Sequence, residues 1–93
     1  MRLELTGRHV EITPTLRRLV DRKLARLERM MNDSAVSAQV VLTSEKRGRR
    51  ADITLHARGE KFLHSDGRGE SLATAMAQAV DRLGQQARKV KGK

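Results

Sequence analysis

Residues 13–31, TPTLRRLVDRKLARLERMM, decide how this chain folds, because they carry the signals of one long amphipathic helix. Thr13 can accept hydrogen bonds from the first free backbone N–H groups, and Pro14 suits the first helical position, where no N–H is needed. Apolar side chains then recur at three- and four-residue spacings, which places them on one side of the helix. They are Leu16, Leu19, Val20, Leu24, Leu27, Met30 and Met31. The stretch therefore predicts a helix with one face against a core.

Arginines occupy the other side of this predicted helix. At about 100° per residue they span roughly 80° of its surface, and Leu27 lies diametrically opposite the first of them. The row consists of Arg18, Arg22, Arg26 and Arg29. Asp21 and Glu28 lie on one flank, where they can pair with arginines one turn away. Many charged rows are simply a solvated helix face, so the helix alone favours a nucleic-acid contact and a solvated surface equally.

The chain as a whole is strongly basic. Its 93 residues contain 20 Lys and Arg against 11 Asp and Glu, which gives a formal net charge of +9 at pH 7. A charge of this size favours a polyanionic partner, most simply nucleic acid, with anionic membrane or an acidic protein as weaker competitors. Phe62 is the only Phe, Tyr or Trp in the chain. A single such ring argues against a stacking platform for single-stranded nucleic acid.

Composition also excludes several kinds of site and of cellular location. The chain has no cysteine, which removes disulfides, thiolate nucleophiles and zinc–thiolate sites. The first residues, MRLELTGRHVEI, contain no continuous apolar run, so they do not resemble a signal peptide. Nothing elsewhere approaches the roughly 18 consecutive apolar residues of a membrane span. We therefore expect a soluble, cytoplasmic protein that does not contact membranes.

Alternating apolar residues predict four strands in the rest of the chain. The first covers residues 2–6 and is expected to end at Gly7, and the second has Val36, Ala38, Val40 and Leu42 on its buried side. Residues 51–58 form the third strand, after a basic hairpin loop with the sequence SEKRGRR. A turn around Gly59 leads to a fourth strand near residues 61–66. Whether that turn has two or three residues decides which side His64 faces, and three would make His56 and His64 cross-strand neighbours.

A second helix is expected near the end of the chain. Residues 66–70, DGRGE, are interpreted as a flexible link, and the helix then runs from about Ser71, which can cap it, to Val90. Its apolar stripe consists of Leu72, Met76, Ala79, Val80, Leu83, Ala87 and Val90. Gly84 should cost the helix about 1 kcal/mol relative to Ala. Residues 88–93 form a basic tail.

The predicted order is thus β-α-β-β-β-α, which indicates an α+β fold. The first three elements imply a right-handed crossover between parallel strands, and the next two links are antiparallel hairpins. We therefore expect one domain over residues 1–93, with two helices packed on one face of a four-stranded mixed sheet. The basic margins of the two helices would then lie side by side as a grooved patch.

Three segments carry a resemblance to a known family: LTGRHVEITPTLRRLVDRKLARLER, EKRGRRADITLHARGE and AVDRLGQQARKVKGK. Together they resemble the ribosome hibernation promoting factor family, also called ribosome-associated inhibitor or sigma-54 modulation protein, over almost the whole chain. The resemblance implies a bacterial protein made when growth slows or under stress. Such a protein binds the small ribosomal subunit in the channel for messenger and transfer RNA, and so blocks translation.

In that family, basic residues of both helices contact ribosomal RNA. The matching positions in this chain are Arg17, Lys23, Arg26, Arg29, Arg82, Lys89 and Lys91. The charge pattern adds Arg18, Arg22 and Arg88 to this set of expected rRNA-binding residues. Where many members begin the second helix with Asp-Met-Tyr, this chain has Ser71, Leu72 and Ala73, and Gln85 stands where arginine is common. The first helix is therefore the firmer part of the prediction.

The chain stops at Lys93, so it resembles the short form of the family, without the additional C-terminal domain of long members. The resemblance then implies that a separate small partner is needed to pair two ribosomes, or that only single ribosomes are silenced. Two other classes of function remain open. One is a general double-stranded RNA-binding module, and the other is a transcription modulator that acts through protein contacts.

No pattern of residues indicates catalysis. The spacing of His9, His56 and His64 fits no zinc motif, and the GRG cluster lacks the lysine and the strand-to-helix setting of a phosphate loop. Glu45 and Asp52 are best interpreted as local partners for the basic residues of the hairpin, namely Lys46, Arg47, Arg49 and Arg50. We therefore expect a binding protein and not an enzyme, with no cofactor, no metal and no small-molecule substrate.

Overall fold

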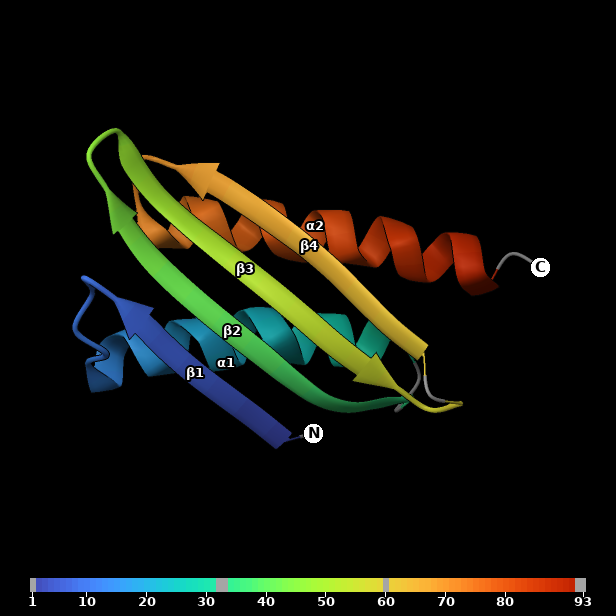
Figure 1. Ribbon diagram of the computed structural model, residues 1–93. Coiled ribbons are helices and arrows are strands. Elements are labelled where there is room, and N and C mark those ends of the chain that lie inside the picture. Colours follow the sequence, from blue (N-terminus) through green and yellow to red (C-terminus); the bar gives the residue numbers. More distant parts are fainter. Residues whose placement is uncertain (1, 32–33, 60, 92–93) are drawn as a thin grey trace.

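The computed structural model describes the backbone of residues 2–31, 34–59 and 61–91, and within these ranges the side chains as far as residue 87. The elements in chain order are β1 (Arg2–Arg8), α1 (Pro14–Met30), β2 (Ala35–Glu45), β3 (Gly48–Ala57), β4 (Lys61–Gly69) and α2 (Leu72–Lys91). The predicted order β-α-β-β-β-α is therefore confirmed (Figure 1).

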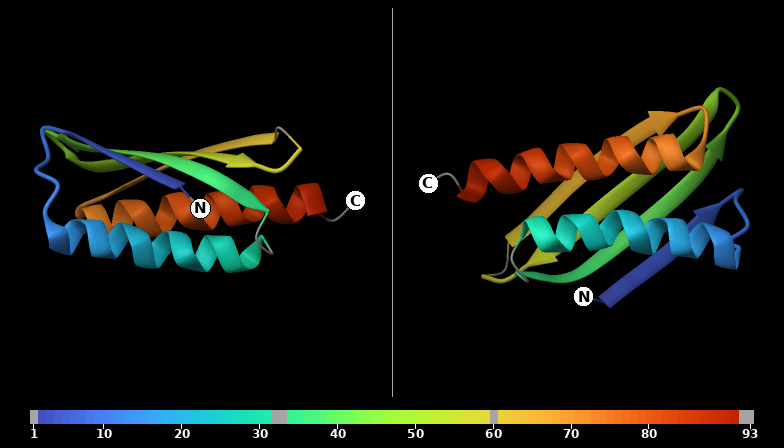
Figure 2. Two further views of the ribbon diagram at one scale, coloured as in Figure 1. Left: turned by 90° about the horizontal axis from the view of Figure 1, so that it is seen from below. Right: turned by 180° about the vertical axis from the view of Figure 1, so that it is seen from behind.

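The strands form one sheet in the order β1-β2-β3-β4. β1 is parallel to β2, whereas the pairs β2–β3 and β3–β4 are antiparallel. Both helices lie on the same face of the sheet, side by side and running in the same direction, and the other face carries no helix (Figure 2). The expected α+β fold, a four-stranded mixed sheet with two helices on one face, is thus confirmed.

Local signals define where both helices begin. The Thr13 hydroxyl accepts a hydrogen bond from the Leu16 N–H at 3.1 Å, and Pro14 is the first residue of α1. The Ser71 hydroxyl accepts from the Thr74 N–H at 3.2 Å and caps α2 in the same way. Each cap satisfies a backbone N–H that the helix itself cannot pair. Both predicted caps are confirmed.

The core lies between the helices and the sheet. β2 contributes Ala38, Val40 and Leu42, and β3 contributes Ala51, Ile53 and Leu55; all six are at most 2% exposed. The apolar faces of the helices cover them, chiefly through Val20, Leu24, Leu27, Met76, Ala79 and Leu83. Since side chains alternate along a strand, the residues between these core positions project from the uncovered face of the sheet.

Several strand boundaries differ from the prediction, and so does the side that Val36 faces. β3 runs from Gly48 to Ala57 and not over residues 51–58, and β2 continues to Glu45, so most of the expected loop SEKRGRR is strand. β1 continues through Gly7 to Arg8, because Gly7 and Arg8 pair with Leu42 and Thr43 of β2. β4 runs to Gly69, so Asp66–Gly69 is strand and not a flexible link. Val36 is 43% exposed, because the register between β2 and β3 shifts between Ala35 and Ser37 and leaves Val36 outside the predicted alternation.

The two hairpins fix which side chains meet across the sheet. Glu45 pairs with Gly48, so the basic hairpin turns at Lys46 and Arg47, and Gly48 has a φ of 148°. Ala57 pairs with Lys61, which leaves three residues between β3 and β4. This register places His64 opposite Thr54 and His56 opposite Phe62. His56 and His64 are therefore not directly paired, although both lie on the uncovered face.

Candidate RNA-binding surface

The outer face of α1 presents a continuous line of cations. The arginine row, defined as Arg18, Arg22, Arg26 and Arg29, is exposed at every position. The opposite side of the same helix is buried at Val20, Leu24 and Leu27. Burial of that side fixes how α1 is rotated on the sheet, so the apolar stripe determines that the arginine row faces away from the core.

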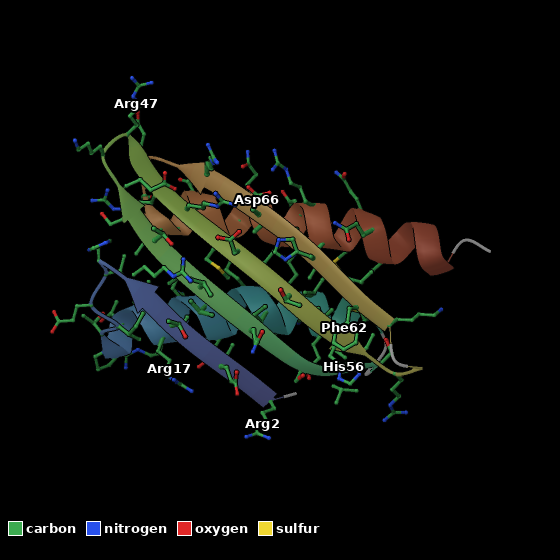
Figure 3. All side chains as sticks on the ribbon, in the orientation of Figure 1. Arg2, Arg17, Arg47, His56, Phe62 and Asp66 are labelled. Carbon is green, nitrogen blue, oxygen red and sulfur yellow. The ribbon has the colours of Figure 1, made fainter. Side chains whose placement is uncertain are left out.

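Two further cations of α1 lie on its flanks. At about 100° per residue, Arg17 falls on the flank that carries Asp21 and Glu28, and Lys23 falls on the flank of Arg26 and Met30. Arg17 is exposed and lies at the start of the helix, on the side away from α2 (Figure 3). Lys23 is half-buried. The six basic residues predicted on α1 therefore form the exposed row plus one cation on either side.

A shallow groove separates α1 from α2. It is lined by Arg26 and Met30 of α1 and by Val80, Asp81, Gly84 and Gln85 of α2. A Cβ at Gly84 would lie 2.7 Å from the Met30 Cε atom, so the missing side chain allows the two helices to approach closely. Gly84, expected only to weaken the helix, thus has a packing role. The predicted groove exists, but on the α2 side its lining includes Asp81 and Gln85.

Arg82 does not line this groove. Its Nη1 atom donates a hydrogen bond to the Asp66 carbonyl oxygen at 2.9 Å and lies 3.8 Å from the Asp66 carboxylate. Arg82 therefore lies against the outer edge of β4, on the flank of α2 away from α1. The prediction that the basic margins of both helices lie side by side is wrong for this residue, because α2 turns Asp81 and Gln85 toward α1 instead.

The remaining predicted cations lie at the end of α2. Arg88, Lys89 and Lys91 belong to the helix, which extends to Lys91, but their side chains lie outside the described residues. Their helical backbone places them beyond the groove, near the C-terminal end of α2 (Figure 1).

The uncovered face of the sheet carries charges that the sequence did not connect. The register aligns Arg8, Thr43, Arg50 and Arg68 across the four strands. The Arg50 Nη2 atom donates to the Asp52 carboxylate at 3.1 Å and lies 3.8 Å from the Asp66 carboxylate. The hydrogen bond from Arg50 and the charge of Asp52 raise the pKa of the Arg50 guanidinium. Strand alternation in the sequence indicates that these residues share a face, but the loop lengths decide which of them are aligned across the strands.

The described part of the chain offers no centre for metal chemistry. Within those residues no group of three or more His, Asp or Glu side chains could hold a metal ion. Among the helices described, none is long and apolar enough to span a membrane. What the surface does offer is an exposed row of guanidinium groups, which are well suited to phosphate contacts.

Comparison with known proteins gives matches over the full length of the chain. A ribosome hibernation promoting factor from Escherichia coli (strain K12) is 38% identical over 93 residues, which cover all of this chain and 96% of that protein. The factor of the same name from Azotobacter vinelandii is 32% identical over all of this chain and 85% of that protein.

Two solved structures have the same fold as this chain. The N-terminal domain of Thermus thermophilus Protein Y superposes with a TM-score of 0.84 at 34% identity, covering 97% of this chain and 99% of that domain. A ribosomal subunit interface protein from Coxiella burnetii gives a TM-score of 0.90 over the whole of both chains. At 22% identity that second likeness concerns the fold alone.

The family model described as Sigma 54 modulation protein / S30EA ribosomal protein matches residues 3–93. This match includes all six described elements except the first residue of β1. Together with relatives above 30% identity over the full chain, it identifies the family that the sequence segments resembled. The chain therefore belongs to the Sigma 54 modulation protein / S30EA ribosomal protein family.

Proposed function

We propose that this protein is a ribosome hibernation factor, which binds the small ribosomal subunit in the channel for messenger and transfer RNA. Relatives at 38% and 32% identity carry the name ribosome hibernation promoting factor. By occupying the channel, the bound protein would keep both RNAs out and stop translation when growth slows. Inhibition then needs no chemical step, because the protein blocks the channel simply by binding there through its exposed arginine row.

The observation that carries the proposal is the exposed arginine row on α1. Four guanidinium groups on one face of a rigid helix can contact successive phosphates, and each contact releases counterions from the RNA. The rigid support matters, because α1 is held by its cap and by the buried side chains of Val20, Leu24 and Leu27. The row can therefore meet a fixed RNA surface without first being ordered.

Charge reversal within the row tests the proposal. Arg22→Glu together with Arg26→Glu should abolish co-sedimentation with small subunits, because two attractive contacts become repulsive. Both side chains are exposed, so the variant should remain folded, as checked by circular dichroism and thermal unfolding. The matched control is Arg8→Glu with Arg68→Glu, which makes the same change in net charge on the uncovered face of the sheet.

The outcomes separate this function from the alternatives. Saturable one-to-one binding to small subunits, displaced by transfer RNA and lost only in the α1 variant, supports hibernation. Equal binding to bare duplex RNA, large subunits and small subunits would instead indicate a general RNA-binding module. The family description also names sigma-54 modulation. Nuclease-resistant binding to a transcription protein, unaffected by the α1 variant, would favour that function.

A further partner belongs to the same proposal. If ribosomes form pairs in the presence of this protein, we expect a separate small dimerising factor to be required. Sedimentation of ribosomes mixed with the purified protein alone would then show silenced single ribosomes. Ribosome pairs in that mixture would contradict the requirement for the second factor.

A further inference from the structure

The uncovered face of the sheet carries a pair of stacked rings that lies far from the arginine row. The centroids of His56 and Phe62 are 4.6 Å apart, and the ring planes are within 10° of parallel (Figure 3). Phe62 is 67% exposed, and in the described residues only Val36 is another exposed large hydrophobic. One exposed apolar residue needs no explanation by itself. Here, however, the His56 ring stacks against the Phe62 ring and fixes its orientation.

The strand register creates this pair. The three-residue link between β3 and β4 sets His56 directly opposite Phe62, on the face away from the helices. Leu55 and Leu63, the next pair in each strand, face the core instead. The imidazole supports one side of the phenyl ring, and the large exposed fraction of Phe62 leaves ring surface available to a flat ligand.

A hollow of polar groups adjoins the rings. Arg2, Glu4, Gln39 and Thr54 line it together with the two rings. The Gln39 amide donates to the Glu4 carboxylate at 3.0 Å, and the Thr54 hydroxyl lies 3.1 Å from the His64 Nδ1 atom. A flat heterocycle stacked on Phe62 would therefore have hydrogen-bond donors and acceptors at its edge. Of the groups lining the hollow, Glu4 carries a negative charge, and Arg2 stands on the same strand beside it.

Cations surround this end of the sheet. Arg2, Arg58 and Lys61 are all exposed, and the chain carries a formal charge of +9. A ligand that combines a flat aromatic ring, polar edges and a negatively charged backbone fits this combination of groups. Unpaired nucleotides of RNA have all three properties, and proteins commonly stack such bases on Phe or His.

We propose that Phe62, supported by His56, is a stacking platform for one unpaired RNA base, with the flanking phosphates near Arg2, Arg58 or Lys61. The inference rests on the proposed binding of ribosomal RNA and adds a contact on the face opposite the arginine row. The single Phe, Tyr or Trp of the chain argued against a stacking platform for single-stranded nucleic acid, because such surfaces usually carry several rings. The structure offers one stacked pair of rings, so the proposed platform takes a single base and not a run of bases.

The first experiment uses Phe62→Trp, which introduces the only tryptophan of the chain. Titration with hexaadenylate or hexauridylate should quench its fluorescence in a saturable way, because a stacked base contacts the indole directly. The matched ligand is an abasic hexamer with the same phosphates and sugars. Its affinity should be at least about tenfold lower, whereas equal affinity and quenching would overturn the proposal, since phosphate attraction alone would explain binding.

The second experiment keeps the wild-type background and changes the ring. Phe62→Leu retains an apolar side chain but cannot stack, and it should weaken hexamer binding roughly 5- to 100-fold in fluorescence anisotropy. Phe62→Tyr should bind as the wild type does. A leucine variant with unchanged affinity would overturn the proposal. So would a dimer of the wild-type chain in sedimentation velocity that Phe62→Leu dissolves, because the rings would then cover a second copy.

A third variant separates this site from the arginine row. Arg22→Gln with Arg26→Gln, placed in the Phe62→Trp background, should no longer bind small subunits. Its affinity for the hexamer should stay within about threefold of that of Phe62→Trp alone. Loss of hexamer quenching in this variant would place the single strand on α1 and overturn the platform. Hexamer quenching in a protein that never binds small subunits would overturn only the proposed function, and the platform would stand.

Discussion

Gly67 and Gly84 are both buried, but a methyl group at each would meet different neighbours. A Cβ at Gly67 would lie 2.6 Å from the Ala79 nitrogen and would collide with the Ala75 carbonyl oxygen, both in the backbone of α2. At Gly84 the nearest atom is the end of the flexible Met30 side chain. The backbone of a packed helix cannot move locally to make room, whereas a methionine side chain can adopt another rotamer. The two glycines therefore differ in what they can tolerate.

This difference gives a matched pair of stability predictions. Gly67→Ala should destabilise the protein by about 1–3 kcal/mol, as overpacked cores do, and lower the melting temperature by roughly 4–8 °C per kcal/mol. Gly84→Ala should change the free energy of unfolding by less than about 1 kcal/mol, because better helix propensity offsets the shift of Met30. Urea unfolding of both variants checks this. Equal losses would mean that the spacing between the helices is as rigid as that between α2 and β4.

Contacts of this kind explain which residues the sequence predicted wrongly. Gly67 reads as part of a flexible link, because nothing in DGRGE shows that α2 packs directly on it. Val36 reads as a core residue, because alternation alone does not reveal the register shift after Ala35. In both cases the deciding contact comes from another element, so no local pattern records it.

Among the elements, α1 was predicted almost completely and β4 was not. The cap at Thr13, the proline and the apolar stripe are all local signals, and they place the helix and its rotation on the sheet. The arginine row follows directly from that rotation. β4 depends instead on α2, whose side chains bond to its outer edge, and those partners lie ten or more residues away in the sequence.

The bonds to that edge come from one row of α2. The Gln78 side chain accepts from the Arg68 N–H at 2.8 Å, Arg82 donates to the Asp66 carbonyl, and Gln86 donates to the His64 carbonyl at 2.7 Å. Spaced four residues apart on the helix, they meet every second residue of the strand. An unpaired strand edge invites pairing with another chain, and this row of side chains covers the backbone groups of that edge.

Removing the two glutamines should expose the edge of β4. Gln78→Ala with Gln86→Ala is expected to cost about 1 kcal/mol of stability and to promote self-association, detected as larger species in sedimentation velocity. Gln85→Ala is the matched control, because Gln85 is also on α2 but lines the groove toward α1. If the double variant stays monomeric at high concentration, the geometry of β4 itself, and not the row, protects the edge.

At the scale of the whole molecule, the sequence predicted the helix-covered side better than the uncovered face of the sheet. The helix face follows from the periodicity of α1, so its arginines could be assigned from the sequence. The uncovered face depends on strand register, and the notable groups there, the His56–Phe62 pair and the line of Arg8, Arg50 and Arg68, became visible only once the lengths of both hairpin turns were known. Arg82 was expected to bind RNA from the family resemblance, and this stays a prediction; in the structure its guanidinium donates to the Asp66 carbonyl and lies 3.8 Å from the Asp66 carboxylate.

The salt dependence of binding tests this division of roles over the whole molecule. If six to ten phosphates are contacted, affinity for small subunits should fall roughly 10³- to 10⁵-fold between 50 and 200 mM salt. Arg22→Gln and Arg26→Gln should each reduce the slope of log K against log salt by about 1, because one phosphate contact is lost. Arg82→Gln should leave the slope unchanged, since this guanidinium is held by Asp66, and Phe62→Leu should do the same, since stacking releases no counterions. Equal reductions in all three arginine variants would show that total charge matters and that the position of the arginine row does not.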